Sequence, residues 1–228
     1  MVNDGGRLKI VLTGASGLVG QGVALACAGS VHVRRTVALV RHAGGLVTAT
    51  EELVLDDFLQ AHRRQADLVG FDACFYCAGA PPLGTAEDAY RRVTLDTTLA
   101  VAQTWFAANP QGMFLYVSGA HANPESHLMP LRIKGETERA LARLPGRTVM
   151  LRPGGVRPVA GTGSRHALLK PLYVVGGPMM QLTAAVLPSM FTSNLVLGRA
   201  MIALAGMPDP PAVVECRQIN QLGNADAG

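Results

Sequence analysis

Short apolar runs alternate with longer segments of helical character over the first 155 residues of the chain. The runs hold four to seven residues, a length typical of buried strands. The expected strands are Leu8–Leu12, Thr36–Val40, Glu52–Leu55, Phe71–Cys77, Met113–Val117 and Arg147–Leu151, with Ala212–Glu215 as a last short one. The expected helices are Leu18–Ala28, Phe58–Asp67, Thr85–Ala108, Pro130–Leu144 and, finally, Asn194–Ala205. Strands that alternate with helices need crossover connections, so the pattern predicts an α/β fold with a doubly wound parallel sheet of six to seven strands.

The alternation lapses after Gly155, where residues 155–190 are rich in Gly, Pro, Met and Leu. No charged residue lies between Pro171 and Gly198, but glycines and prolines interrupt this stretch. A spanning helix needs about 20 apolar residues in one helix, so a transmembrane segment is not expected. We expect residues 155–190 to form a small irregular C-terminal lobe over a pocket, within a single domain covering residues 1–228. A membrane-touching or dimerising surface is the competing interpretation.

Composition narrows the class of protein. With 49% hydrophobic and 16% charged residues, the chain is not disordered. The net charge of +4 is modest, no basic run exceeds a pair, and aromatic residues make up 5%, which argues against a nucleic-acid partner. The segment Met1–Lys9 has no apolar run of signal-peptide length, so a cytoplasmic protein is expected. Cys74 and Cys77 would lie about 10 Å apart on opposite faces of one strand, as core side chains rather than a disulfide.

Three glycines follow the first expected strand and open the first helix. Gly14, Gly17 and Gly20 form the spacing G-x-x-G-x-x-G. Such glycines allow a tight turn, a close approach of backbone to a diphosphate, and close packing of the helix. The helix N-terminus adds free N–H groups and a partial positive charge. The segment therefore predicts a dinucleotide on a Rossmann-type sheet, with an ordinary Gly-rich turn as the alternative.

The second expected strand ends at Arg41 and His42, without an acidic residue. An acid at this place typically binds a ribose 2′-hydroxyl, whereas an arginine accommodates a 2′-phosphate. The sequence thus favours NADP, with NAD still possible; a solvated Arg41 is the alternative interpretation. Asp56, at the end of the third strand, is placed to meet the adenine edge.

Four segments in order resemble the short-chain dehydrogenase/reductase superfamily, in particular its extended and atypical members of the NAD-dependent epimerase/dehydratase type. They are Thr13–Gly20, Cys77–Gly79, Tyr116–Ser118 and Lys134–Glu136. Two further segments, Ser118–Ser126 and Leu131–Glu136, are similar to the Tat-interacting-protein-like oxidoreductase branch. The resemblance covers roughly residues 8–158 and implies a dinucleotide-dependent oxidoreductase or epimerase.

The resemblance also implies roles for individual residues. Ser118 would polarise the substrate oxygen, and Lys134 would hold ribose hydroxyls and lower the pKa of a catalytic tyrosine. The implied cofactor contacts are Gly14, Ser16, Gly17, Leu18 and Val19 at the diphosphate, Cys77, Ala78 and Gly79 along the nicotinamide-side ribose, and Pro153 and Val156 beside the nicotinamide.

The tyrosine itself is missing from its place in the motif. Four residues before Lys134 the chain has Pro130, which cannot exchange a proton, a step worth about 10²–10⁴ in rate. Thr94 stands where the family often has an asparagine. His121 or His127 could relay the proton; the alternative is that both are surface histidines. They do not make a metal site, because no third ligand converges with them.

Two other tyrosines and two functions remain open. Tyr116 lies two residues before Ser118, about 7 Å back along the strand, and nothing in the sequence fixes the position of Tyr173. The first function is an NADP-dependent oxidoreductase or epimerase acting on a small, mainly apolar carbonyl or alcohol, with Ser118, Lys134 and His127 as catalytic residues. The second is a protein that binds NADP(H) as a sensor. Pairing of the long helices leaves a homo-oligomer open.

Overall fold

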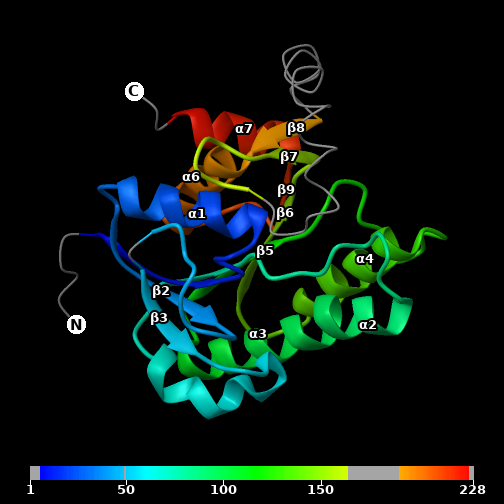
Figure 1. Cartoon of the computed structure of the whole chain (residues 1–228), viewed down its shortest axis with the longest axis horizontal. Helices are drawn as coiled ribbons and strands as arrows, with labels where there is room; N and C mark the ends of the chain where they lie inside the picture. The colour runs from blue at the N-terminus through cyan, green and yellow to red at the C-terminus, as the bar shows by residue number, and fades with distance from the viewer. Residues whose placement is uncertain (1–5, 49, 164–189, 226–228) are drawn as a thin grey trace.

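The fold is built on one seven-stranded parallel sheet with the strand order β3-β2-β1-β4-β5-β6-β9 (Figure 1). The structure, a computed structural model, describes residues 6–48, 50–163 and 190–225. The strands are β1 Leu8–Thr13, β2 Val33–Val40, β3 Glu51–Val54, β4 Ala73–Tyr76, β5 Met113–Val117, β6 Arg147–Arg152 and β9 Val213–Glu215. The chain runs outward from β1 to β3 and then returns to place β4 on the other side of β1. This reversal confirms the predicted doubly wound sheet. It makes the carboxyl ends of β1 and β4 the switch point, which is where such sheets typically bind ligands.

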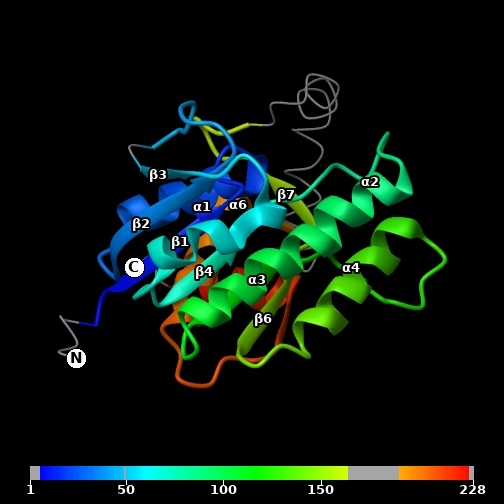
Figure 2. The ribbon, with the colours of Figure 1, turned by 90° about the horizontal axis from the view of Figure 1, so that it is seen from below.

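Helices cover both faces of the sheet (Figures 1 and 2). On one face lie α1 Leu18–Gly29, α6 Asn194–Ala205 and α7 Cys216–Ala225. On the other lie the 3₁₀ segment η1 Phe58–Leu68, α2 Glu87–Arg91, a π-helical turn η2 Arg92–Asp96, α3 Thr97–Ala108 and α4 Met129–Leu141. Alternate strand residues feed the two cores: Ile10 and Leu12 pack on the α1 side, and Val11 packs on the α3 side. Burial on both faces explains why the strands read as nearly continuous apolar runs.

Three features differ from the sequence expectation. The helix expected over residues 85–108 is divided by the π-helical turn η2. A second small sheet pairs β7 Gly155–Arg157 with β8 Phe191–Ser193. The helix α7 follows β9, so the helix Asn194–Ala205 is not the last one. Strands β7 and β8 are three residues each and exist only through pairing with each other, so no local pattern announces them.

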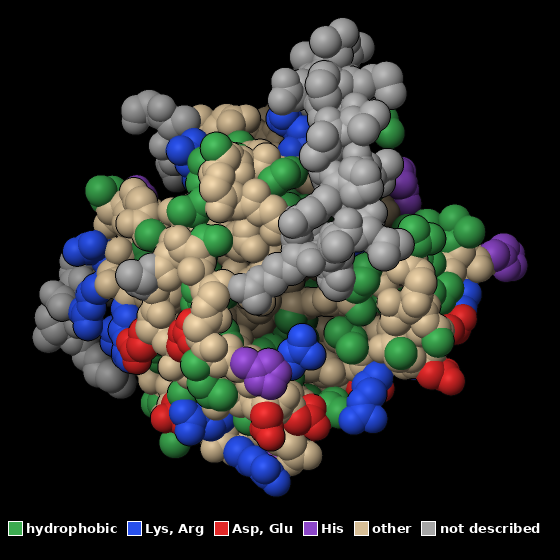
Figure 3. Space-filling view, viewed as in Figure 1, with side chains coloured by type: hydrophobic (Ala, Val, Ile, Leu, Met, Phe, Trp, Pro, Cys, Tyr) green, Lys and Arg blue, Asp and Glu red, His purple; other side chains and the backbone are tan. Residues whose placement is uncertain are grey.

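Most of the predicted apolar lobe lies outside the described residues, namely 164–189, and Tyr173 lies there too. Within the described part of the chain, no helix is long and apolar enough to cross a membrane. The cysteines fit the sequence interpretation: both are free, Cys74 is buried in the core on the α3 side, and Cys77 packs against the core on the α1 side. On the face shown in Figure 3, Lys and Arg side chains are interspersed with Asp and Glu.

Candidate functional site

The turn between β1 and α1 is built almost entirely from backbone. Gly14 adopts a positive φ of +70°, and a Cβ atom there would lie 2.6 Å from the backbone nitrogen of Ala78. At Gly20 a Cβ atom would lie 2.1 Å from the carbonyl oxygen of Gly14, so the helix packs directly on the turn. Both glycines are therefore required by close contact. Gly17, the N-cap of α1, is exposed and has more room.

The N-terminus of α1 is free of competing side chains in the described chain. Gly17 offers no side-chain cap, and the first turn holds no acidic residue. Its N–H groups and the positive end of the helix dipole are thus available to an anion. The hydroxyl of Thr13 accepts hydrogen bonds from the N–H groups of Cys77, at 3.2 Å, and Ala78, at 3.3 Å, which fixes the turn to the end of β4. Sequence reasoning missed Thr13, although a threonine ending a buried strand is a usable signal.

Two buried amides hold the turn from behind, and both were missed from the sequence. Gln21 Oε1 accepts a hydrogen bond from the Gly163 N–H at 2.8 Å. Asn194 Nδ2 donates to the Leu18 carbonyl at 2.8 Å and to the Thr162 hydroxyl at 2.9 Å. A buried polar side chain must be satisfied in this way. These hydrogen bonds therefore join the first turn of α1, the start of α6 and the segment 159–163.

The residues expected at the adenosine end lie after β2 and β3. Arg41, His42 and Asp56 are all exposed at the carboxyl ends of these neighbouring strands. The Gly44 N–H donates to Glu52 Oε2 at 2.7 Å, so a β3 carboxylate holds the loop that follows Arg41. Arg41 and Asp56 lie at the same edge of the sheet as the Gly14 turn, and their contacts with a nucleotide stay a prediction.

Ser118 and Lys134 meet at the carboxyl end of β5. The Ser118 N–H donates to the Leu151 carbonyl at 2.8 Å, while its Oγ is buried without a hydrogen-bond partner among the described residues. Lys134, in the middle of α4, donates from Nζ to the carbonyl oxygens of Val117 at 3.2 Å and Ser118 at 2.9 Å. Burial lowers the pKa of Lys134 to about 8, and the carboxylate of Glu138 partly opposes this shift.

An ion pair under this site links α4 to the sheet. Arg152, the last residue of β6, donates from Nε and Nη2 to the two carboxylate oxygens of Glu138, at 3.0 and 2.6 Å. Arg152 also pairs with Glu215 at 3.1 Å. The hydrogen bonds to Glu138 raise the pKa of the Arg152 guanidinium, and the two opposite charges compensate each other in a largely buried place. Sequence reasoning did not identify this pair.

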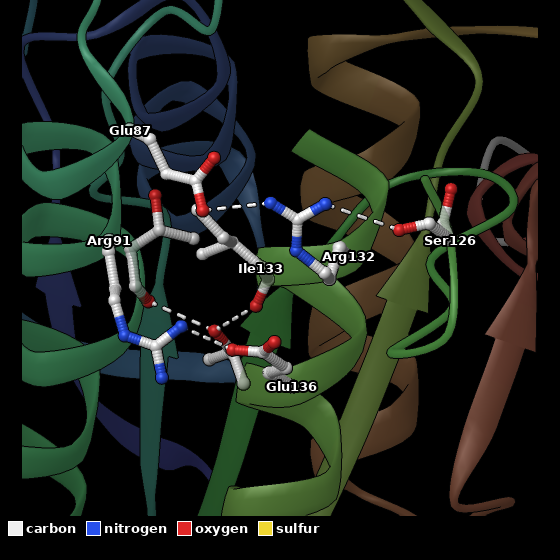
Figure 4. Close-up of polar contacts among 8 residues, drawn as sticks. Glu87, Arg91, Ser126, Arg132, Ile133 and Glu136 are labelled. Atoms are coloured by element: carbon white, nitrogen blue, oxygen red, sulfur yellow. Dashed lines mark hydrogen bonds and ion pairs between the residues drawn. The ribbon is translucent and has the colours of Figure 1, made fainter. Parts of the chain in front are cut away.

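Helix α4 is held on its other side by α2. Arg91 pairs with Glu136, and Arg132 Nη2 donates to Glu87 at 2.8 Å (Figure 4). Along α2 the acidic residue comes before the basic one, and along α4 the basic residue comes first. The two ion pairs therefore bridge α2 and α4 across a partly exposed face. Together with the Arg152 pair, they set the position of α4 and hence of Lys134 over β5.

The remaining residues of the expected catalytic set are spread apart. His121 and His127 are exposed, and His121 has a positive φ of +61°. Pro130 lies in the first turn of α4, where its missing N–H costs no hydrogen bond. Tyr116 is buried, and burial raises the pKa of its phenol well above the usual value. Thr94 lies in the π-helical turn, a feature common at functional sites.

Other expected cofactor contacts fall on the same edge of the sheet. Cys77 and Ala78 are partly exposed, and Gly79 is exposed after β4. Pro153 follows β6, and its carbonyl accepts a hydrogen bond from the Ala120 N–H at 2.9 Å, while Val156 lies in β7. The partly exposed residues of the first turn are Ser16, Leu18 and Val19. These features fit a dinucleotide with its reactive end near Ser118: the N-terminus of α1 has no side-chain cap, the Gly14 turn has no room for a side chain, and the Ser118 hydroxyl has no hydrogen-bond partner among the described residues.

Comparison with known proteins adds structural relatives. No protein-family model and no curated protein sequence matches the chain. Solved structures do match, among them MoeE5 in complex with UDP-glucuronic acid and NAD, with a TM-score of 0.68 at 17% identity over 90% of this chain and 75% of that one. A short-chain dehydrogenase/reductase superfamily protein from Agrobacterium tumefaciens with bound NAD gives 0.63 at 15% identity, covering 90% and 76%.

A third matching structure is that of an epimerase. UDP-glucuronic acid 4-epimerase from Bacillus cereus in complex with NAD matches with a TM-score of 0.64 at 14% identity over 90% of this chain and 76% of that one. At such identities the likeness establishes the fold. The chain therefore has the Rossmann-type α/β fold of NAD-dependent epimerases and dehydrogenases of the short-chain dehydrogenase/reductase type, the fold indicated by its sequence motifs.

Proposed function

We propose that this protein binds a pyridine dinucleotide, preferentially NADP, and acts as an oxidoreductase or epimerase on a small carbonyl or alcohol. The observation that carries the proposal is the uncapped N-terminus of α1 above the Gly14 turn, at the same edge of the sheet as the unpartnered Ser118 hydroxyl two strands away. The bound dinucleotide would supply hydride donation or acceptance. A reducing, cytoplasmic setting suits the free cysteines, Cys27, Cys74, Cys77 and Cys216.

In this proposal, different residues of the chain bind different parts of the cofactor. The N–H groups of the first turn of α1 hold the diphosphate, and the guanidinium of Arg41 pairs with a 2′-phosphate, assisted by His42. Asp56 meets the adenine, and the strand-end segments after β4 and β6 line the ribose and nicotinamide. The matched structures were crystallised with NAD, so NAD is the alternative cofactor.

The substrate side is proposed from Ser118. Its hydroxyl has no partner and can donate a hydrogen bond to a substrate oxygen. We propose a small, mainly apolar carbonyl compound. A sugar nucleotide is the alternative, because MoeE5 was crystallised with UDP-glucuronic acid. A panel containing both classes separates them.

A binding protein without turnover is the second candidate function. Pro130 favours it, because a proline in the place of the family's tyrosine cannot move a proton. In that case the protein would hold NADP(H) as a sensor. Tight binding of the dinucleotide without turnover of any compound in the panel would support this alternative.

The binding site is tested by Gly17→Asp, with Gly17→Asn as the matched control. Either side chain can cap α1, which stabilises a helix by a few tenths of a kcal/mol relative to glycine, so thermal stability should not fall. The aspartate adds a negative charge where the diphosphate would lie. We expect calorimetry to show NADPH affinity about five- to thirtyfold weaker for Asp than for Asn, from the loss of a helix-terminus interaction of roughly 1–2 kcal/mol. Equal affinities for the two variants, or no binding by the wild type, would overturn the proposed site.

A further inference from the structure

The amine of Lys134 has a hydrogen-bonding arrangement that suits both of its protonation states. Nζ donates to two carbonyl oxygens, those of Val117 and Ser118. An ammonium has three N–H donors, so one N–H remains unused by this pair. A neutral amine has two N–H donors and a lone pair, so it satisfies the same carbonyls and leaves the lone pair in place of the third proton. The geometry therefore permits loss and gain of a proton without breaking either contact.

The surroundings of Lys134 act on its charge in opposite directions. Burial lowers the pKa to about 8, whereas Glu138, one helical turn further along, raises it. Glu138 is itself held by Arg152, which makes its carboxylate a weaker partner for the ammonium. From β5, the ring of Tyr116 has its centroid 5.3 Å from Nζ. Lys134 thus exchanges its proton near neutral pH, unlike an unperturbed lysine at about 10.4.

Other proton donors in the described chain are less well placed. Tyr116 is buried in the core, and its pKa is raised well above the usual value. Tyr90, on α2, is buried as well, and burial raises its pKa. His121 and His127 are exposed on the loop between β5 and α4. Lys134 does reach the end of β5, where its Nζ donates to the backbone carbonyl of Ser118.

We propose that Lys134 is itself the general acid and base of the reaction, in the role that the resemblance gives to a tyrosine at the position of Pro130. This inference rests on the proposed function. In the reducing direction, a bound reduced dinucleotide would supply a hydride to the substrate carbonyl carbon, and the C=O π electrons would move to oxygen. That oxygen takes a proton from Lys134 Nζ, so an O–H bond forms as an N–H bond breaks. The neutral amine then regains a proton from water.

The first test measures the amine directly, without turnover. The chain has three lysines, Lys9, Lys134 and Lys170, so protein labelled with ¹³C at lysine gives few Cε signals. The signal that disappears in Lys134→Arg belongs to Lys134. We expect it to titrate with a midpoint near pH 8. A midpoint near the ordinary value of about 10.4 would overturn the proposal.

Two variants of the ion pair test the electrostatic origin of this midpoint. Glu138→Gln removes a charge that favours the ammonium, so the Lys134 midpoint should fall. Arg152→Met removes the guanidinium that compensates Glu138, so the midpoint should rise. Arg147→Met is the matched control, because Arg147 begins the same strand and donates to the Gln111 carbonyl at its opposite end. Shifts of the wrong sign, or an equal shift in the control, would contradict the assignment.

Kinetics supply the second test. Lys134→Arg keeps a cation and N–H donors but cannot release a proton near neutral pH. We expect turnover lower by about 10²–10⁴ at saturating nucleotide, with nucleotide binding still measurable by calorimetry. For the wild type, reduction should decline as pH rises through 8, because the ammonium is lost, and oxidation should decline as pH falls through 8.

The outcomes separate this proposal from the proposed function. Failure of the wild type to bind any pyridine dinucleotide would overturn the proposed function. Binding with turnover that Lys134→Arg retains would overturn the role of Lys134 alone. Binding without turnover of any compound in the panel would also overturn that role and would favour the sensor.

Discussion

The candidate site has two halves, one formed by backbone groups and the other by side chains. On the β1–α1 side the ligand would meet backbone: Gly14 has no room for a side chain, and α1 begins without a cap. On the β5–α4 side the chemistry depends on the side chains of Ser118 and Lys134, and Pro130 occupies the first turn of α4. The first half agrees with the motif of the family it resembles, and the second departs from it.

The two halves differ in how well they tolerate the exchange of a residue. A backbone cradle is fixed by contacts such as those between Gly14 and Ala78, so exchange of one residue disturbs both packing and binding. A catalytic side chain on an exposed helical turn can be exchanged without loss of the fold, because Pro130 fits the start of α4. Binding can therefore persist while the chemistry changes or disappears.

The largest effect is expected for Gly14→Val, which attacks the backbone half. A side chain there combines a positive φ with a contact of 2.6 Å to the backbone of Cys77 and Ala78. We expect unfolding free energy to fall by at least about 3 kcal/mol and dinucleotide binding to be lost. Chemical denaturation and calorimetry measure both. Gly29→Ala, with nothing within 4 Å of its Cβ, is the control. If Gly14→Val bound the dinucleotide as tightly as the wild type, the Gly14 turn would not be the binding site.

Pro130→Tyr changes the side-chain half and should leave the cradle intact. A phenol one turn before Lys134 restores the family's pair on one helix face. We expect NADPH oxidation with the carbonyl panel to rise by about tenfold to a hundredfold, up to the lower end of the roughly 10²–10⁴ that a general acid contributes. Nucleotide affinity should stay within about threefold, as both halves are separate. An unchanged rate in a variant that folds and binds would mean that position 130 does not face the reacting oxygen.

Arg41→Ala should give the smallest and most selective effect. Removing one exposed charge-assisted hydrogen bond costs about 1.5 kcal/mol, or roughly tenfold in NADPH affinity, while NADH affinity should hardly change. Calorimetry with both dinucleotides measures the ratio, and Arg63→Ala, an exposed arginine on η1, serves as control. Equal weakening of both cofactors would remove the case for NADP.

Local patterns predicted the parts of the fold that depend on short stretches of chain. The helix Asn194–Ala205 agrees in both bounds with α6, and β1, β5 and β6 differ from expectation by no more than one residue, because buried strands and helices carry their own periodicity. The glycine spacing likewise located the turn. The π-helical turn η2 and the paired strands β7 and β8 lacked such a signal, since each depends on packing against distant segments.

By itself, the sequence determined the order of the seven strands of the main sheet, the glycine turn and the presence of Pro130 before Lys134. Only the tertiary structure decided which distant residues hold these parts in place. Asn194 donates to the carbonyl of Leu18, 176 residues away in the sequence, and Arg152 at the end of β6 pairs with Glu138 on α4. It also decided that Lys134 is buried against the carbonyls of β5. Hydrophobic period and turn propensity act over a few residues, whereas the protonation of a buried amine depends on whatever the folded sheet brings beside it.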